Sequence, residues 1–181
     1  MIKNIISAWM LCFLFACDSG KQQNIEYFDT KSFFEATITR LSAHGNLLHK
    51  ELMFGDSTVT QQPSTVNWAN ELQPFVEIDL HKNAYKARFK ADTSKQANTY
   101  QVTYTPLDTQ TDLKNLVVTI DNSTDAISSI HARFSEQNTL YEATKELVFY
   151  NDSLFTISGS QQVKLGKNIS YSITGTITGG Q

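Results

Sequence analysis

Cysteine is scarce in this 181-residue chain, which has only Cys12 and Cys17, both near the N-terminus. The rest of the chain therefore cannot be held by disulfides, and its stability must come from a hydrophobic core. Basic clusters are lacking as well, because 15 lysines and arginines stand against 18 aspartates and glutamates with no basic block. Binding to nucleic acid needs clustered positive charge that displaces counterions. A nucleic-acid partner is therefore not expected.

Motifs of catalytic, metal and cofactor sites are also missing. The four histidines show neither HxH nor HExxH spacing, which the common zinc sites need. The sequence contains no GxSxG elbow, phosphate-binding loop, dinucleotide glycine pattern or Ser-x-x-Lys. Glu142 and Glu146 could form a carboxylate pair, but Lys145 between them is typical of a solvated strand edge. We therefore predict no metal, no cofactor and no catalytic residue.

The N-terminus has the features of an export signal. Lys3 precedes an apolar run that is too short to span a bilayer, which needs ~20 apolar residues. We interpret residues 1–16 as a signal peptide. The run ends in Leu14-Phe15-Ala16-Cys17, which resembles the bacterial lipobox, where a small residue precedes the cysteine whose sulfur receives the diacylglycerol. Cys17 is therefore predicted to be the lipidated first residue of the mature protein.

The lipid on Cys17 predicts that the protein is held at a membrane of the cell envelope. The residues that follow this cysteine are polar and show no periodic pattern, which is typical of a flexible linker. Residues 17–27 are therefore predicted to be the lipidated cysteine and a tether. A single domain over residues 28–181 is expected to follow.

Two amphipathic segments are predicted to be helices. Asp29 or the residue after it can cap the first helix, which Gly45-Asn46 ends. The second helix is expected to begin at Pro63-Ser64, and Pro74 inside it makes it short or kinked. Residues 47–62 between them are predicted to form a β-hairpin. The apolar stripes are Phe34, Ile38 and Leu41 in the first helix and Trp68, Leu72 and Phe75 in the second.

From residue 84 onward, apolar residues alternate with polar ones, which is typical of strands with one buried and one solvated face. Turn-like stretches such as Asn151-Asp152-Ser153 separate the strands. We therefore predict an α+β fold: a curved antiparallel meander, or incomplete barrel, covered by the two N-terminal amphipathic helices. The first of these strands is expected to include Tyr85, Ala87, Phe89 and Ala91.

This order of elements resembles the outer-membrane lipoprotein carrier and receptor family, whose incomplete barrel is closed by helices. The strings Ile157-Ser158-Gly159-Ser160-Gln161-Gln162 and Ile173-Thr174-Gly175-Thr176-Ile177 also look like those of small Bacteroidota lipoproteins. The resemblance implies a half-barrel at the cell envelope, but no position here matches a functional motif of the carriers. Asp18 after the lipidated cysteine resembles an inner-membrane retention signal of enteric bacteria. In the Bacteroidota, acidic residues there accompany surface export, so we expect the outer membrane rather than the inner one.

Aromatic residues are concentrated on the predicted apolar face of the sheet. They could line a cavity with polar groups, suited to an acyl chain or another apolar ligand. The same rings could instead fill the core beneath the helices. The candidate ligand-binding residues are Tyr85, Phe89, Tyr104, Phe134, Tyr141, Phe149 and Tyr171, and Tyr100 and Phe155 share their face.

Three functions therefore remain open from the sequence. The first is a lipid-anchored, non-enzymatic module that binds an apolar ligand or lipid on the concave face of its sheet. The second is a partner subunit or structural component of an envelope complex, and the third is an enzyme with a dispersed site. A cavity above ~300 Å³ would favour the first. A large exposed apolar patch would favour the second, and converging titratable groups in a cleft would favour the third.

Overall fold

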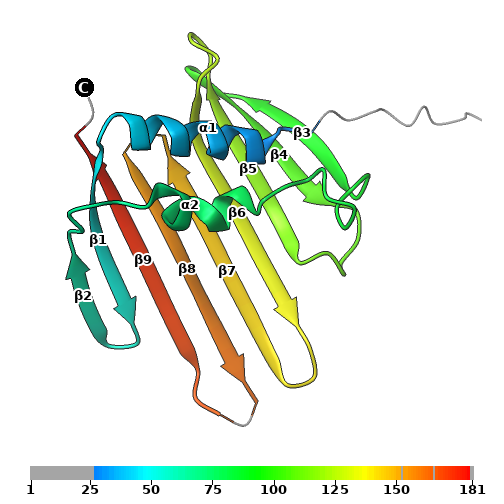
Figure 1. Cartoon of the computed structure of the whole chain (residues 1–181). Coiled ribbons are helices and arrows are strands. Elements are labelled where there is room, and N and C mark those ends of the chain that lie inside the picture. Colours follow the sequence, from blue (N-terminus) through cyan, green and yellow to red (C-terminus); the bar gives the residue numbers. More distant parts are fainter. Residues whose placement is uncertain (1–26, 152, 165, 180–181) are drawn as a thin grey trace, which may run out of the picture.

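The computed structural model describes residues 27–151, 153–164 and 166–179, which form helices along one face of a single sheet (Figure 1). The predicted signal peptide, Cys17 and residues 18–26 of the predicted tether lie outside the described residues. In chain order the elements are α1 (Thr30–Ala43), β1 (Leu47–Phe54), β2 (Ser57–Gln61), α2 (Trp68–Val76), β3 (Phe89–Lys95), β4 (Thr99–Pro106), β5 (Leu113–Asp121), β6 (Ile127–Gln137), β7 (Tyr141–Tyr150), β8 (Leu154–Val163) and β9 (Ile169–Thr178).

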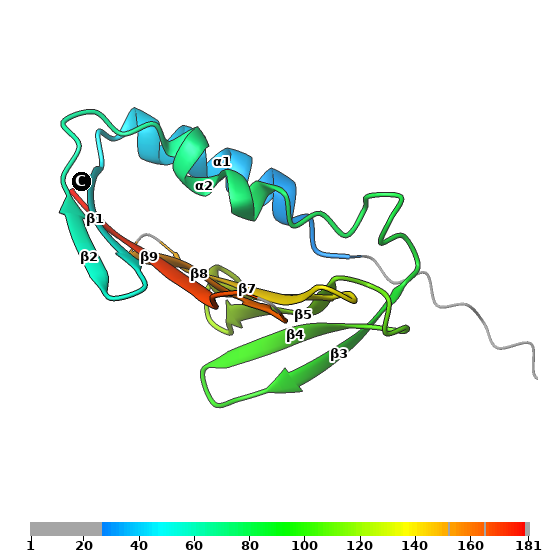
Figure 2. The same ribbon diagram turned by 90° about the horizontal axis from the view of Figure 1, so that it is seen from below.

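The strands form one antiparallel sheet in the order β2-β1-β9-β8-β7-β6-β5-β4-β3. From β3 to β9 each strand pairs with the next, which confirms the predicted meander. The predicted hairpin at 47–62 is β1–β2, and it joins the sheet beside β9, the last strand of the meander. The sheet is open, with β2 and β3 as its two edges, and it bends toward the helices at the β2 edge (Figure 2).

Helix α1 begins and ends where the sequence predicts. The Asp29 side chain accepts a hydrogen bond from the backbone N–H of Ser32 at 2.9 Å, which satisfies a donor that the first turn leaves unpaired. Two residues beyond the helix, Gly45 has φ +63°, a conformation that glycine adopts without strain. Phe34 and Leu41 of the predicted stripe are fully buried, and Ile38 is half-buried.

Helix α2 begins at Trp68, later than the predicted start at Pro63-Ser64. Its N-cap is Asn67, whose side chain accepts a hydrogen bond from the backbone N–H of Asn70 at 3.2 Å. Because Asn67 directly precedes Trp68, this cap places the whole apolar stripe inside the helix. Pro74 lies in the last turn, and the helix ends two residues later, so it is short as predicted.

The first strand of the meander begins at Phe89, so the prediction that Tyr85 and Ala87 belong to it is wrong. The backbone N–H of Tyr85 donates to the Lys82 carbonyl at 2.9 Å, and that of Arg88 donates to the Tyr85 carbonyl at 3.0 Å. Ala87 has φ +58°, which a strand does not allow. Tight turns therefore replace the expected alternation before β3.

Both helices lie on the same face of the sheet, which we call the helix-side face (Figure 2). They cross one end of β6 to β9, and the other ends of these strands extend beyond both helices (Figure 1). The predicted cover is therefore partial. The main core lies where helices and strands meet, and it includes Phe34, Leu72, Phe75, Ile130, Phe149 and Phe155.

Candidate functional site

The strand register places eight of the nine rings singled out above on the helix-side face, all except Tyr85. The helices divide these rings into two groups. Phe149 is fully buried, with its ring centroid 5.0 Å from that of Phe34 in α1 and 5.9 Å from that of Phe75 in α2. Phe89 and Phe155 are buried in the same core. Where the helices cover the face, these rings fill the core and leave no space for a ligand between them.

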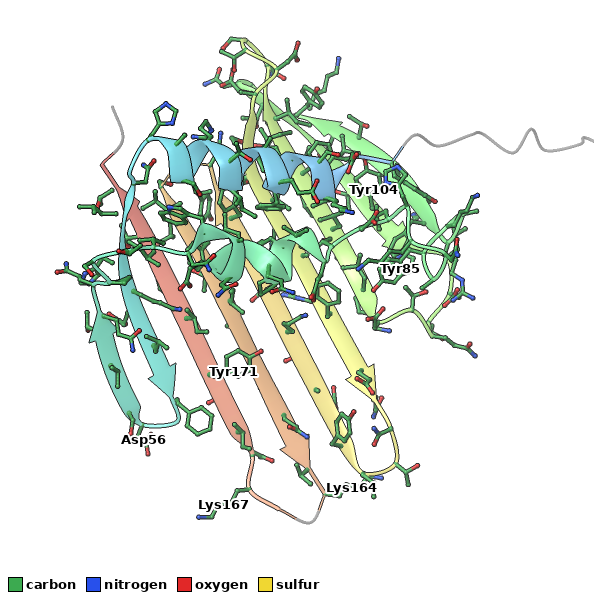
Figure 3. The ribbon with its side chains drawn as sticks, viewed as in Figure 1. Asp56, Tyr85, Tyr104, Lys164, Lys167 and Tyr171 are labelled. Atoms are coloured by element: carbon green, nitrogen blue, oxygen red, sulfur yellow. The ribbon has the colours of Figure 1, made fainter. Side chains whose placement is uncertain are left out.

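Tyr104 also belongs to the covered group, and its hydroxyl has a partner within the protein. The hydroxyl oxygen accepts a hydrogen bond from the backbone N–H of Phe28 at 3.0 Å, and the Tyr27 ring stacks edge-on at 5.9 Å. Burial raises the pKa of Tyr104, although the hydrogen bond from Phe28 opposes this shift. Tyr104 therefore holds the residues just before α1 against the sheet, in a place where the sequence suggested a ligand (Figure 3).

Tyr85 packs against the core from its loop rather than from a strand. Its ring lies edge-on to Phe89 at 5.6 Å, and its hydroxyl donates to Asp112 Oδ1 at 2.7 Å. Burial, followed by the hydrogen bond to Asp112, raises the pKa of Tyr85. This tyrosine fastens the α2–β3 connection to the start of β5, because Asp112 directly precedes that strand.

Beyond the helices, the same face of β6 to β9 forms an open groove of about 330 Å³. Two of the predicted ligand-binding residues, Phe134 and Tyr171, line it, and Figure 3 shows Tyr171 on the part of the sheet that neither helix crosses. The groove is lined by Asp112, Phe134, Ser135, Glu136, Ala143, Thr144, Lys145, Ser160, Gln161, Ile169 and Tyr171.

Lys145 places a positive charge in the open groove, although the sequence indicates a solvated strand edge at this position. The register pairs Lys145 with Phe134 on β6 and Gly159 on β8, so it shares the face of Leu147 and Phe149. Its Nζ lies 4.6 Å from the centroid of the Phe134 ring, an attractive cation–π contact. The sequence alone predicts this placement, because Lys145 occupies a position of the alternating pattern that faces the same side as Leu147 and Phe149.

Two glycines allow aromatic rings to lie flat across neighbouring strands. A Cβ on Gly159 would lie 2.7 Å from the Tyr171 ring, and one on Gly175 would lie 2.2 Å from Phe155. Each ring therefore occupies the space above the glycine with which its own residue pairs. The Tyr171–Gly159 pair lies in the open groove, whereas Phe155–Gly175 lies under the helices. Tyr171 reaches across the groove floor because position 159 has no side chain.

Tyr141 belongs to a separate polar hollow of about 320 Å³, at the turns that end β6 and β8. Its hydroxyl donates to Glu136 Oε1 at 2.9 Å, and this hydrogen bond raises the pKa of Tyr141. The hollow also contains Glu142 and Lys164. Of the seven predicted residues, the structure thus brings together only Phe134 and Tyr171 in a space that a ligand could enter.

The opposite, outer face carries a charged cluster of His131, Arg133 and Glu146. His131 Nε2 lies 2.7 Å from Glu146 Oε1, and Arg133 Nη2 lies 3.3 Å from the same oxygen. The hydrogen bond from His131 lowers the pKa of Glu146. The cluster is partly exposed to solvent, and it lies apart from the open groove and the polar hollow described above. Within the described ranges, no three His, Cys, Asp or Glu side chains gather in a way that could hold a metal ion.

The chain matches no protein-family model and no curated protein sequence. It resembles a crystal structure provisionally described as an outer membrane protein from Bacteroides fragilis, with 14% sequence identity and a TM-score of 0.24. The alignment covers 76% of this chain and 52% of that protein, so the chain spans about half its length. Neither α1 nor α2, the helices of the described residues, is long and apolar enough to cross a membrane.

Proposed function

We propose that this protein is a lipid-anchored lipoprotein of the cell envelope whose open groove binds an amphiphilic molecule. The observation that carries the proposal is the groove itself, because its volume of about 330 Å³ is in the range of small-molecule sites. Phe134, Ile169 and Tyr171 offer it apolar surface, and Lys145 offers a positive charge. A ligand with an apolar tail and an anionic head matches this combination, and a fatty acid is the simplest example.

The apolar surface of the groove continues directly into the hydrophobic core of the sheet. A binding surface of this kind favours a non-enzymatic role. Tyr171 lies directly above Gly159, and the next residues along these strands, Ile173 and Ile157, pack into the core. The groove is therefore a shallow, preformed surface that can hold an apolar chain against the sheet. Its two carboxylates, Asp112 and Glu136, already accept hydrogen bonds from Tyr85 and Tyr141.

Ligand binding is expected to raise the melting temperature of protein made from residue 18 onward. Oleate should raise it progressively with concentration, because a ligand that binds only the folded state stabilises by about 2.7 kcal/mol at 100 times its Kd. Replacing Lys145 with glutamine should weaken the effect of oleate by removing the charge that faces the carboxylate. Differential scanning fluorimetry across an oleate series measures both effects.

The control is Lys90→Gln, which removes an exposed lysine far from the groove, beside Asp92 on β3. This variant should respond to oleate like the wild type. Phe134→Ala should lose response, whereas Tyr150→Ala, an exposed aromatic residue on the outer face, should not. If no amphiphile shifts the melting temperature at any concentration, the groove does not bind this class of ligand.

Lipidation at Cys17 is tested separately from ligand binding. Cells that express the full chain with Cys17→Ser are expected to incorporate no alkyne fatty acid into the protein, because the thioether cannot form on serine. The protein should also leave the membrane fraction, since it loses the acyl chains that hold it there. Cys12→Ser is the matched control and should be labelled like the wild type. Labelling of the Cys17→Ser protein would show that the anchor assignment is wrong.

A further inference from the structure

Strand β2 is an edge of the sheet that nothing in the described part of the chain covers. It pairs with β1 on one side only, and all five of its residues are exposed. Gly55-Asp56 forms the two-residue loop of the hairpin, so the flanking Phe54 and Ser57 form a hydrogen-bonded pair. Hydrogen-bonded and non-hydrogen-bonded pairs then alternate along β1 and β2. Val59 turns its backbone N–H and C=O toward β1, while Thr58 and Thr60 turn theirs outward.

The other edge of the sheet, β3, has the protection that β2 lacks. Lys90, Asp92 and Lys95 place charges along β3, and charged edges resist pairing with another strand. The Tyr27 hydroxyl also caps this edge, because it donates to the Phe89 carbonyl at 3.0 Å and accepts from the Phe89 N–H at 3.3 Å. In contrast, Ser57–Gln61 has no charged residue, proline or bulge.

Exposed apolar side chains gather on the same hairpin. Of the eight large hydrophobic side chains that are exposed in the described part of the chain, four belong to β1 or β2. Val59, at the centre of the open edge, is 54% exposed, and Phe54 at the turn is 63% exposed. Both are on the helix-side face, whereas Leu47 and Met53 are on the outer face. An uncharged strand with apolar neighbours on both faces suits addition of another strand.

We propose that β2 pairs antiparallel with β2 of a second copy of this chain, about a twofold axis at Val59. In this register Thr58 lies opposite Thr60 of the partner subunit, and Ser57 lies opposite Gln61 of the partner subunit. Thr58 and Thr60 are the residues with outward backbone groups, so both Thr–Thr pairs become hydrogen-bonded pairs. Val59 then meets Val59 of the partner subunit as a non-hydrogen-bonded pair, where side chains approach most closely.

The sequence of β2 makes a second copy the partner that fits best. Thr-Val-Thr reads the same in both directions, so the twofold pairing places threonine opposite threonine and valine opposite valine. Asp56 at the turn faces Gln62 of the partner subunit, so no like charges meet along the strand. The pairing keeps the helix-side faces of both copies on the same side. The two sheets would become one continuous sheet with both open grooves on one surface.

The test is disulfide trapping of the full-length protein in the cells that express it. Val59→Cys should give a reducible dimer on mild oxidation, because the α-carbons of a non-hydrogen-bonded pair lie about 4.5 Å apart, within disulfide range. Thr93→Cys, at an exposed position on the β3 edge, should give none. Wild-type protein treated with the same oxidant sets the background from Cys12 and Cys17.

A proline then tests whether the open backbone edge holds the two copies together. Thr60→Pro removes an outward N–H without breaking a bond to β1, so an edge strand tolerates it. In the Val59→Cys background it should abolish the dimer while the melting temperature stays close to that of wild type. Thr93→Pro removes an outward N–H from the β3 edge and should leave the dimer intact. Absence of a Val59→Cys dimer above background, or a disulfide adduct with a different protein, would overturn the proposal.

Discussion

Replacing Phe149 with alanine is expected to lower the free energy of unfolding by about 3–5 kcal/mol. The Phe149 ring is fully buried and contacts Phe33 and Phe34 of α1 and Phe75 of α2, so it joins both helices to the sheet. Removing it leaves a cavity that rigid neighbours cannot fill. A domain of this size is stable by about 5–15 kcal/mol, so the variant should lose a large fraction of its total stability. Urea denaturation followed by circular dichroism measures the loss.

Tyr150→Ala is the matched control, because Tyr150 follows Phe149 in β7 but is 48% exposed on the outer face. It should change stability by no more than about 0.5 kcal/mol. The comparison also separates a core ring from a ligand-binding ring. If Phe149→Ala kept wild-type stability but lost its response to oleate, Phe149 would line a ligand cavity rather than the core.

Replacing Gly175 with alanine is expected to cost about 3 kcal/mol, the upper end of the range for overpacked cores. The added methyl group would lie 2.2 Å from Cζ of Phe155, and this ring cannot move away because it is fully buried. Phe75 of α2 lies against it at 6.1 Å between ring centroids. The clash should therefore separate α2 from the sheet. Thermal and urea unfolding of the variant provide the measurement.

Gly159→Ala is the matched control because it adds the same methyl group beneath the other ring that lies over a glycine, that of Tyr171. That methyl group would meet the Tyr171 ring at 2.7 Å, but Tyr171 borders the open groove and can turn into it. The expected loss of stability is about 1 kcal/mol, the lower end of the range for an added methyl group. Combining Gly175→Ala with Phe155→Leu should recover part of the lost stability, as interacting neighbours do. If the stability losses of the two substitutions were strictly additive, contact with the Phe155 ring would not be the cause of the loss in Gly175→Ala.

The sequence predicts the local features of this fold well, because they depend on neighbouring residues. The Asp29 cap, the Gly45 stop and the β1–β2 hairpin all follow from short-range preferences. The strand faces follow from alternation, which is a property of one strand at a time. The error at Tyr85 concerns a segment where apolar alternation continues into turns. There, backbone hydrogen bonds such as that from Tyr85 to Lys82 decide the outcome. The predicted start of α2 at Pro63-Ser64 is too early, because Asn67 caps the helix.

The candidate site was only partly predictable, because its position depends on where the helices end. Phe134 and Phe149 have the same pattern in the sequence, yet one borders the groove and the other is in the core. The difference arises from how far α1 and α2 extend along the strands, a property of tertiary packing. Lys145 was predictable in principle, since its strand position assigns it to the apolar face.

The position of the β1–β2 hairpin has a consequence for how the protein folds. Leu47 pairs with Thr178, so β1 and β9 are adjacent in the sheet although they are far apart in the sequence. Loop-closure entropy opposes such distant pairing, and proteins dominated by it fold in milliseconds to seconds rather than microseconds. The sheet can be completed only after β9 has been synthesised. A chain interrupted before β9 would leave the hairpin without its neighbour and expose the apolar face that Leu48 shares with Ile177.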